Sequence, residues 1–373
     1  MEYTLIAPCY FGTESVLNYE IKKIGGRDID VSDGRIVFKG DENIIAAANI
    51  NLRTAERVLI LLKEFKATDF DRLFDGVFSI DWKSTLPLDA EFPVKGSSLS
   101  STLSSVPACQ KIIKKSIVEK MRKQYRESIL PENGDLYKIR FSIRKDIVSI
   151  MLDTSGDGLH KRGYRRNSGE APIKETLAAA IVDLARIRDD SLVQDPFCGS
   201  GTLLIEAAQK ALNIAPGLKR HFAAEKYSFI PKSVWEEERQ KRKDAVKTDA
   251  EFTAYGFDID PLVLETAKKN ADKAGVGKYI KFFRADVKKF EPRENSTVIT
   301  NPPYGERLGD LQQAITLEKV LAKRLELNPV KSYYVITSDG EFENNFGKKR
   351  NKRRKLYNGM IPCQLYMYFG ERK

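Results

Sequence analysis

Helix and strand patterns alternate along the second half of this sequence, from Glu170 onward. Helical patterns cover 173–187, 202–212 and 261–274, and short apolar strand patterns cover 191–194, 254–257, 280–283, 297–300, 332–338 and 364–369. Strands that are joined by helices lie parallel in one sheet, and the helices then cover both of its faces. We therefore expect an α/β domain over residues 159–373, built on a mostly parallel sheet.

The first 158 residues follow another pattern, with short strands and helices separated by turns. Strands at 3–7 and 55–65 and helices at 13–24 and 41–52 predict an α+β unit over residues 1–65. A second unit over 66–158 is expected to hold strand structure within 70–93, a basic amphipathic helix at 108–128 and paired strands at 137–143 and 147–152. The stretch 213–251 interrupts the later alternation, and we expect a solvated helix there without a chemical role.

Composition excludes several kinds of protein. Two His and four Cys, with no C-x-x-C pair, leave no zinc site and no disulfide framework to propose, and a reducing compartment fits best. No apolar run approaches the roughly 18 residues of a membrane span. The first residues, MEYTLIAPCYFG, lack the basic region of a signal peptide. We expect a cytoplasmic protein without a metal or a membrane anchor.

Basic residues are concentrated in three clusters. The chain has 63 Lys+Arg and 52 Asp+Glu, a formal net charge of +11. Such clusters attract the phosphate backbone of nucleic acids, although a solvated face explains any single cluster equally well. In the helix at 108–128, apolar residues recur every four positions and leave the Lys residues largely outward. The candidate nucleic-acid contacts are Lys111, Lys114, Lys115 and Arg122 in this helix, then Lys161, Arg162, Arg165 and Arg166, and finally Lys348, Lys349, Arg350 and Arg353.

A glycine loop, DPFCGSGT, joins the strand at 191–194 to the helix at 202–212. Its glycines allow a sharp turn and close approach of a ligand to the backbone. A P-loop would need Gly-Lys-Ser/Thr, and a dinucleotide-binding loop would need a third glycine where Leu204 stands. A ligand without phosphate remains, and Asp195 suits a cationic amine. The candidate cofactor-binding residues of this loop are Asp195, Gly199, Ser200, Gly201 and Thr202.

Acidic residues also follow the next two strands. Asp258 can accept hydrogen bonds from two ribose hydroxyls, and Asp286 can accept one from an adenine amino group. Each aspartate taken singly is explained equally well as a helix N-cap. An amine, a ribose diol and an adenine together describe S-adenosylmethionine, which we predict as the cofactor.

The strand at 297–300 runs directly into Asn301-Pro302-Pro303-Tyr304. Two prolines cannot continue a sheet, so the chain leaves it at the carboxyl edge, where open α/β sheets bind ligands. Acceptors at Asn301 and at the Pro302 carbonyl would hold an exocyclic amine of a nucleobase and direct its lone pair at a methyl group, while Tyr304 would stack on the base. These four residues are the predicted catalytic set, and Asn301 is also predicted to border the cofactor.

These motifs carry a resemblance to a known family. DPFCGSGTLLIEAA, YGFDIDP, RADV and NPPYGERLG resemble the class I S-adenosylmethionine-dependent amino-methyltransferases, and HKRGYRRNSGEAPIKETLAAAI resembles the segment before their glycine loop. KLYNGMIPCQLYMYF resembles the final strands of THUMP-domain methyltransferases that modify guanine N2 in large-subunit ribosomal RNA. The resemblance implies a Rossmann-like domain with a seven-stranded sheet, preceded by a ferredoxin-like piece (1–65) and a THUMP RNA-binding module (66–158). Some bacterial relatives carry a second, fused methyltransferase domain, which we do not expect in these 373 residues.

The resemblance favours an RNA guanine-N2 methyltransferase acting on 23S ribosomal RNA. Transfer RNA is the nearest other substrate, and DNA or RNA adenine N6 stays open because the Asn-Pro-Pro-Tyr motif is shared with adenine methyltransferases. A non-catalytic RNA-binding assembly factor is the alternative outside the enzyme class. The sequence does not choose the modified nucleotide or the oligomeric state.

Overall fold

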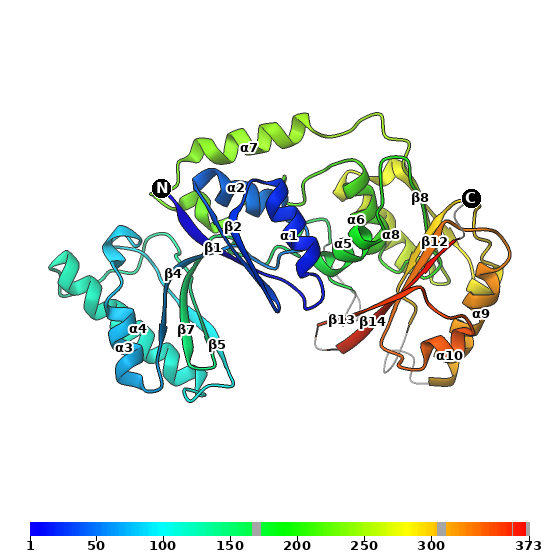
Figure 1. Cartoon of the computed structure of the whole chain (residues 1–373). Coiled ribbons are helices and arrows are strands. Elements are labelled where there is room, and N and C mark those ends of the chain that lie inside the picture. The colour runs from blue at the N-terminus through cyan, green and yellow to red at the C-terminus, as the bar shows by residue number, and fades with distance from the viewer. Residues whose placement is uncertain (166–172, 304–310, 360, 371–373) are drawn as a thin grey trace.

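The computed structural model describes residues 1–165, 173–303, 311–359 and 361–370, and the chain forms an arch (Figure 1). One limb is built on a seven-stranded sheet with the order β2-β3-β1-β4-β7-β6-β5. Its strands are β1 (Tyr3–Pro8), β2 (Arg27–Ser32), β3 (Arg35–Gly40), β4 (Leu59–Lys66), β5 (Val94–Leu99), β6 (Ile139–Arg144) and β7 (Ile147–Asp153). Its helices are α1 (Glu14–Lys23), α2 (Glu42–Asn51), α3 (Phe70–Phe78) and α4 (Val106–Tyr125).

Strand β4 joins the two N-terminal units that the sequence predicts. Ile60 pairs with Leu5 of β1 on one side and with Leu152 of β7 on the other, both in antiparallel register. The expected units 1–65 and 66–158 therefore share one sheet, and a single hydrophobic core extends beneath both.

One expectation for this limb is wrong. Residues 70–78, read as strand, form helix α3. Asp69 caps the helix by accepting a hydrogen bond of 2.8 Å from the Arg72 backbone N–H. Leu73 and Val77 lie one turn apart and are buried, which fits a helical period and not the alternation of a strand.

The other limb confirms the predicted α/β domain. Its seven-stranded sheet has the order β10-β9-β8-β11-β12-β14-β13; the first four neighbouring pairs are parallel and the pairs made by β14 are antiparallel. Its strands are β8 (Leu192–Asp195), β9 (Thr253–Asp258), β10 (Ile280–Arg284), β11 (Thr297–Thr300), β12 (Ser332–Thr337), β13 (Lys352–Asn358) and β14 (Ile361–Phe369). Its helices are α5 (Glu175–Leu184), α6 (Thr202–Ala211), α8 (Pro261–Ala274), α9 (Leu311–Leu325) and α10 (Phe342–Phe346).

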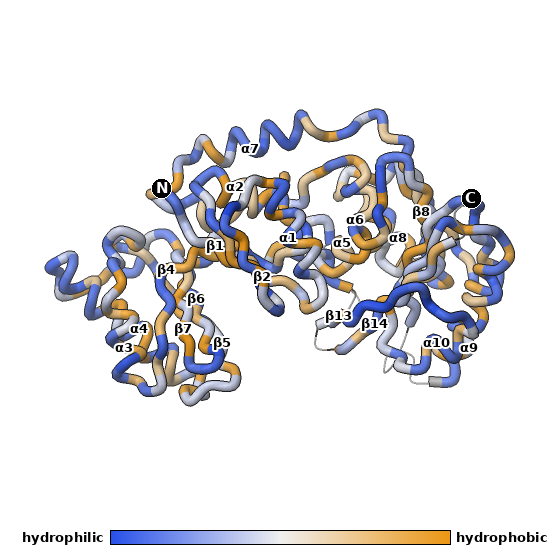
Figure 2. Tube along the Cα trace, viewed as in Figure 1, coloured by the Kyte–Doolittle hydropathy of each residue, from blue (hydrophilic) through white to orange (hydrophobic). Residues whose placement is uncertain are grey.

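Helices cover both faces of this sheet, because successive strand residues point to opposite sides. Ile299 of β11 packs with α5, α6 and α8 in one core, whereas its neighbour Val298 packs with α9 and α10 in another. Apolar segments therefore line the interior of the domain on either side of the strands (Figure 2).

The stretch 213–251 packs against the N-terminal limb. Helix α7 (Lys232–Asp244) runs beside α2 (Figure 1), and the Trp235 side chain is 2% exposed. Its indole stacks on Phe222 with ring centroids 5.6 Å apart, and Asn51 Nδ2 donates a 2.6 Å hydrogen bond to Glu238 Oε1. The expected solvated helix thus has one face buried in the N-terminal core, so this insertion ties the α/β domain to that limb.

Among the helices of the described ranges, none combines the length and the apolarity that crossing a membrane requires.

Candidate active site

The candidate site lies where the order of the catalytic sheet reverses direction. β8 and β11 are parallel neighbours, with Val193 opposite Thr297, and the chain proceeds from β8 toward β10 on one side and from β11 toward β13 on the other. Open α/β sheets bind ligands at the carboxyl ends of the strands at this position. A cavity of about 860 Å³ opens there, and it is lined by Asp195, Gly199, Ser200, Thr202, Asp258, Asp286, Asn301 and Pro303 among others.

Asp195 ends β8 and is 1% exposed. Its Oδ1 accepts a 2.6 Å hydrogen bond from the Thr300 hydroxyl and a 3.0 Å bond from the Phe197 backbone N–H. Burial raises the pKa of Asp195 to about 7, and the nearby Asp258 carboxylate adds to this increase, while the two donors oppose it. A buried carboxylate in this state gains from a cationic partner, which is the role that the sequence predicts for it.

The glycine loop makes the sharp turn that its sequence predicts, through left-handed backbone at both glycines. Gly199 has a φ of +51° and Gly201 a φ of +81°, values that side chains disfavour. A Cβ at Gly199 would meet no atom within 4 Å, whereas one at Gly201 would meet the Phe282 ring at 3.2 Å. The loop is fixed from both sides, because Gly199 N donates to Asp258 Oδ2 over 3.0 Å and Asn270 Nδ2 donates to the Ser200 carbonyl over 3.2 Å.

Asp258 and Asp286 both stand at strand ends beside the cavity. Asp258 Oδ1 accepts from the Asp260 N–H and its Oδ2 from the Gly199 N–H, each at 3.0 Å. Asp286 Oδ1 accepts from the Lys288 N–H at 2.8 Å and so caps the 3₁₀ turn Val287–Lys289. A carboxylate has about four lone-pair sites, so both side chains retain acceptor capacity for a ligand. Cofactor contacts for these residues stay a prediction.

Asn301 follows β11 and carries an unusual acceptor. Its Oδ1 is buried and has no hydrogen-bond partner among the described residues. Buried polar atoms are almost always paired, because an unpaired one costs roughly 1–3 kcal/mol. Pro302 is buried and Pro303 lines the cavity beside it. Tyr304 lies outside the described residues.

The cavity fits S-adenosylmethionine. Asp195 would pair with the amine, Asp258 and Asp286 have acceptors that would suit hydroxyl and amino groups, and Ile259, Leu262 and Val287 form an apolar lining that would suit a purine. Its volume lies within the 300–1,000 Å³ or so that is usual for small-molecule sites. When bound, the cofactor would supply an electrophilic methyl group, and Asp195, Asp258 and Asp286 are the residues that would hold it.

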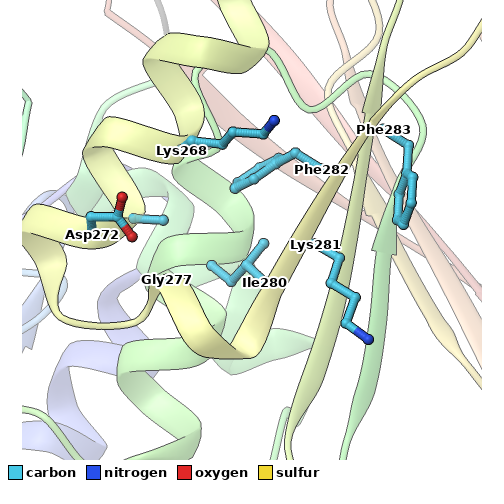
Figure 3. A pocket seen from close by; sticks show the side chains of 8 residues that line it. Lys268, Asp272, Gly277, Ile280, Lys281, Phe282 and Phe283 are labelled. Atoms are coloured by element: carbon cyan, nitrogen blue, oxygen red, sulfur yellow. The ribbon is translucent and has the colours of Figure 1, made fainter.

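A second hollow, of about 480 Å³, lies between α8 and the edge strand β10 (Figure 3). Lys268 and Asp272 line it from the helix, and the Ile280 and Phe282 side chains point toward it from the strand. It contains none of the predicted site residues. The Phe282 ring, packed against Gly201 and Gly256, separates it from the glycine loop.

Some of the basic residues predicted to contact RNA are exposed, and others bond to neighbouring protein groups. The exposed ones are Lys111, Lys115 and Arg122 on α4, and Lys161, Lys348, Lys349 and Arg353 elsewhere in the chain. Lys115 lies 3.7 Å from Glu119, Lys161 pairs with Asp157 at 3.1 Å, and Arg350 pairs with Glu343. Arg166 lies outside the described residues. Contact of the exposed residues with RNA stays a prediction.

Three expectations about this set are corrected. Lys114 is only partly exposed and its ammonium group is engaged: its Nζ bonds Glu132 at 2.6 Å and lies 3.3 Å from the Phe92 ring centroid. Arg162 is 6% exposed and donates to the Leu159 and Arg53 carbonyls. Arg165 donates to the Thr202 hydroxyl and the Ile173 carbonyl. In the sequence, each of these three cations belongs to a cluster of basic residues of the kind that is usually exposed. In the structure, the buried carboxylates draw the two arginines inward, because Glu206 lies 3.6 Å from Arg162 and Glu175 lies 3.6 Å from Arg165.

Sequence reasoning missed three features of the site. Thr300 and Arg165 anchor segments that line the cavity, by bonding Asp195 and Thr202. Helix α9, which the sequence analysis does not predict, contributes Gln313 and Leu317 to the cavity. A hydrogen bond between a hydroxyl on one strand and a carboxylate on another leaves no signal in the sequence. Helix α9 does leave a signal, because its apolar residues Ala314, Leu317 and Leu321 recur with a helical period.

The strand order, with acids at successive carboxyl ends, defines a class I methyltransferase fold. Residues 162–367 match the RMKL-like methyltransferase domain, 67–153 the THUMP domain and 4–59 the RlmL ferredoxin-like domain. The chain therefore belongs to the RMKL-like, THUMP-containing methyltransferase family. The cofactor of this family member is S-adenosylmethionine, as predicted.

Individual proteins agree with this assignment. "Putative RNA methyltransferase YpsC" of Bacillus subtilis is 43% identical over 99% of this chain and 97% of its own length. The ribosomal RNA large subunit methyltransferase K/L of Psychromonas ingrahamii is 36% identical over 97% of this chain, which spans only 49% of that relative. The structure of SMU.472, "a putative methyltransferase complexed with SAH", superposes with a TM-score of 0.94 at 39% identity, covering 100% and 99% of the two chains.

Proposed function

We propose that this chain transfers the methyl group of S-adenosylmethionine to the exocyclic N2 amine of a guanosine in 23S ribosomal RNA. The observation that carries the proposal is the buried Asn301 Oδ1, which lines the cofactor cavity without a partner in the described part of the chain. An acceptor in this state is satisfied by a substrate N–H. Asn301 lines the same cavity as Asp195 and Asp258, which supports a position beside the transferable methyl.

The chemistry requires activation of a poor nucleophile. The lone pair of an exocyclic amine is delocalised into the purine ring. Hydrogen bonds from this amine to Asn301 Oδ1 and the Pro302 carbonyl would let the nitrogen pyramidalise and direct its lone pair at the methyl carbon. In-line positioning of amine, methyl and sulfur would supply most of the rate, for which roughly 7–11 kcal/mol is available.

No histidine lines the cavity among the described residues. His160 lies 3.7 Å from Glu56 and the His221 side chain is 91% exposed. We therefore propose that no general base acts before methyl transfer. The proton would leave after the nitrogen becomes cationic.

RNA as the substrate is supported by the THUMP match and by the names of the relatives. The K/L-type names favour large-subunit ribosomal RNA over transfer RNA. Helix α4, with its exposed cations, belongs to the N-terminal limb, and the cofactor cavity lies in the other limb (Figure 1). An RNA that contacts both limbs would engage the two surfaces.

The test is a nucleoside digest. Purified protein is incubated with methyl-labelled S-adenosylmethionine and ribosomal RNA from cells that lack this gene, and the RNA is then digested and separated. Label in N2-methylguanosine is expected. Label only in N6-methyladenosine, or only when transfer RNA or duplex DNA is supplied, contradicts the proposal.

A further inference from the structure

The edge strand β13 ends at the same side of the sheet as the active site. β12 pairs antiparallel with β14, and β14 pairs antiparallel with β13, so β13 runs parallel to β12 and β11. The registers place Thr300 opposite Val335, Val335 opposite Tyr366, and Tyr366 opposite Arg353. Arg353 is therefore level with the residue that precedes Asn301, three strand spacings away. At about 4.8 Å per spacing, this separation is roughly 14 Å.

Three residues of β13 alternate onto one face of the sheet. Arg353 and Lys355 are exposed and Tyr357 is partly exposed, whereas Leu356 between them is buried on the other face. Side chains two positions apart in a strand lie roughly 6.6 Å from each other. The strand thus presents two cations and one aromatic ring in a row that passes the carboxyl edge of β12.

The N-terminal limb completes this row with a second aromatic ring. Phe11, 43% exposed, meets Tyr357 edge to face, with centroids 6.2 Å apart and planes at 83°. Lys355 Nζ lies 5.6 Å from the Tyr357 centroid. An edge-to-face pair leaves a ring face available for stacking, and an adjacent cation suits a phosphate.

The backbone fixes the Phe11 loop onto β13. Gly12 has a φ of +87°, and a Cβ there would lie 2.3 Å from the Lys355 carbonyl oxygen. Arg354 donates to the Gly12 carbonyl at 2.9 Å and to Ser15 Oγ at 3.1 Å. The nearby acid Glu14 is turned into its own loop, where it accepts from the Gly12 and Gly34 N–H groups. The two rings are therefore held together by both limbs.

We propose that an unpaired stretch of RNA next to the target nucleotide binds to one surface, which we call the β13 ledge. The β13 ledge consists of Phe11, Arg353, Lys355 and Tyr357. One base would stack on the aromatic pair while Arg353 and Lys355 contact phosphates. Charge complementarity selects this occupant, since seven of the eight residues from 348 to 355 are basic. The inference rests on the proposed RNA substrate and adds the position of its flanking strand.

The test uses the full chain and a 5′-fluorescein-labelled, single-stranded 12-nucleotide RNA of mixed sequence, titrated by fluorescence anisotropy. Base–aromatic stacking is worth enough that Tyr357→Leu should weaken binding on the order of fivefold or more, while Tyr357→Phe should bind like wild type. Tyr19→Leu, which removes an exposed ring from α1, is the matched control and should leave affinity unchanged. Lys355→Gln should lower the salt slope by about 0.7, and Lys241→Gln on α7 should not.

Thermal melting first establishes that the variants are folded. Wild-type affinity in Tyr357→Leu, or equal weakening by Tyr19→Leu, overturns the ledge. Equal dependence on Tyr357 for a duplex DNA of the same sequence overturns the choice of unpaired RNA. Absence of methyl transfer to ribosomal RNA by the wild-type chain contradicts the proposed function, whereas transfer that coexists with unchanged Tyr357→Leu binding contradicts the ledge alone.

Discussion

The Thr300 hydroxyl donates a 2.6 Å hydrogen bond to Asp195 Oδ1. Thr300 is the last residue of β11 and Asp195 the last of β8, so the bond crosses the point where the sheet order reverses. Asn301 directly follows Thr300. This contact therefore links the side chain that is predicted to hold the cofactor amine to the residue that precedes the predicted substrate acceptor.

Replacing Thr300 by Val removes this donor while keeping the side-chain shape. Asp195 then loses one of its two donors, its pKa rises further, and its carboxylate is less available to a cationic amine. A hydrogen bond to a charged group is worth roughly 1.5–3 kcal/mol, so S-adenosylhomocysteine should bind at least about tenfold more weakly by calorimetry. Thr297→Val, on the same strand but 3.5 Å from Ser332 Oγ, is the control. Equal losses in both variants would assign the effect to packing.

Cofactor affinity should depend on pH through Asp195. Burial raises the pKa of this carboxyl to about 7, so below pH 7 it is mostly protonated and must lose a proton to pair with the amine. Affinity for S-adenosylhomocysteine should therefore rise as pH increases to 7 and level off above it, with up to about tenfold loss per unit below. Calorimetry from pH 5.5 to 8.5 measures this, and Asp195→Asn should remove the dependence. A flat wild-type profile would contradict the assigned partner.

The positions of most candidate site residues could be predicted because they depend on chain order. A parallel sheet brings the carboxyl ends of its strands together, so Asp195, Asp258, Asp286 and Asn301 had to meet once the strands were recognised. The local pattern was also sufficient to predict a sharp turn at the loop glycines, because glycine permits the positive φ values that both adopt.

Features that depend on distant partners could not be predicted. In the sequence HKRGYRR, Arg162 looks like a surface cation. In the structure it lies 3.6 Å from Glu206, which is 44 positions later in the chain and so could not be recognised as its partner. Trp235 looks like one apolar residue in a charged helix, and its burial requires Phe222 and the N-terminal core. The α3 segment was misread because its aromatic residues have strand propensity, which the Asp69 cap and the core contacts overrule.

Asn301→Ala should nearly abolish methyl transfer while the affinity for S-adenosylhomocysteine stays within about threefold of wild type. The Asn301 Oδ1 has no partner in the described structure, so its removal should matter only when the substrate amine is present. Removing one such group from a preorganised site typically costs about 10²–10³ in rate. Single-turnover assays and calorimetry on the same variant separate the two effects. A normal transfer rate would exclude the proposed acceptor.

Glu318→Gln should stabilise the protein, and more so as pH rises. Burial raises the pKa of Glu318 to about 8, and the neighbouring Asp339 adds to the increase. The folded state therefore holds a proton that the unfolded state releases above about pH 4.5, so the stability contribution present at low pH is lost as pH rises toward 8. Gln resembles the protonated form and avoids this loss. Melting temperatures from pH 5 to 8 should diverge in favour of the variant, and the exposed Glu265→Gln on α8 should show no divergence.

Some cations of α4 should contribute to RNA binding, and Lys114 should contribute to the stability of the fold instead. Lys111, Lys115 and Arg122 are exposed, so changing all three to Gln should weaken RNA binding and lower its salt slope by about 0.7–0.9 for each phosphate that is no longer neutralised. Lys114 instead bonds Glu132 and the Phe92 carbonyl. Lys114→Gln should therefore lower the melting temperature and leave the slope unchanged. Salt titrations and melts of both variants test this division, and an unchanged slope in the triple variant would mean that α4 faces solvent alone.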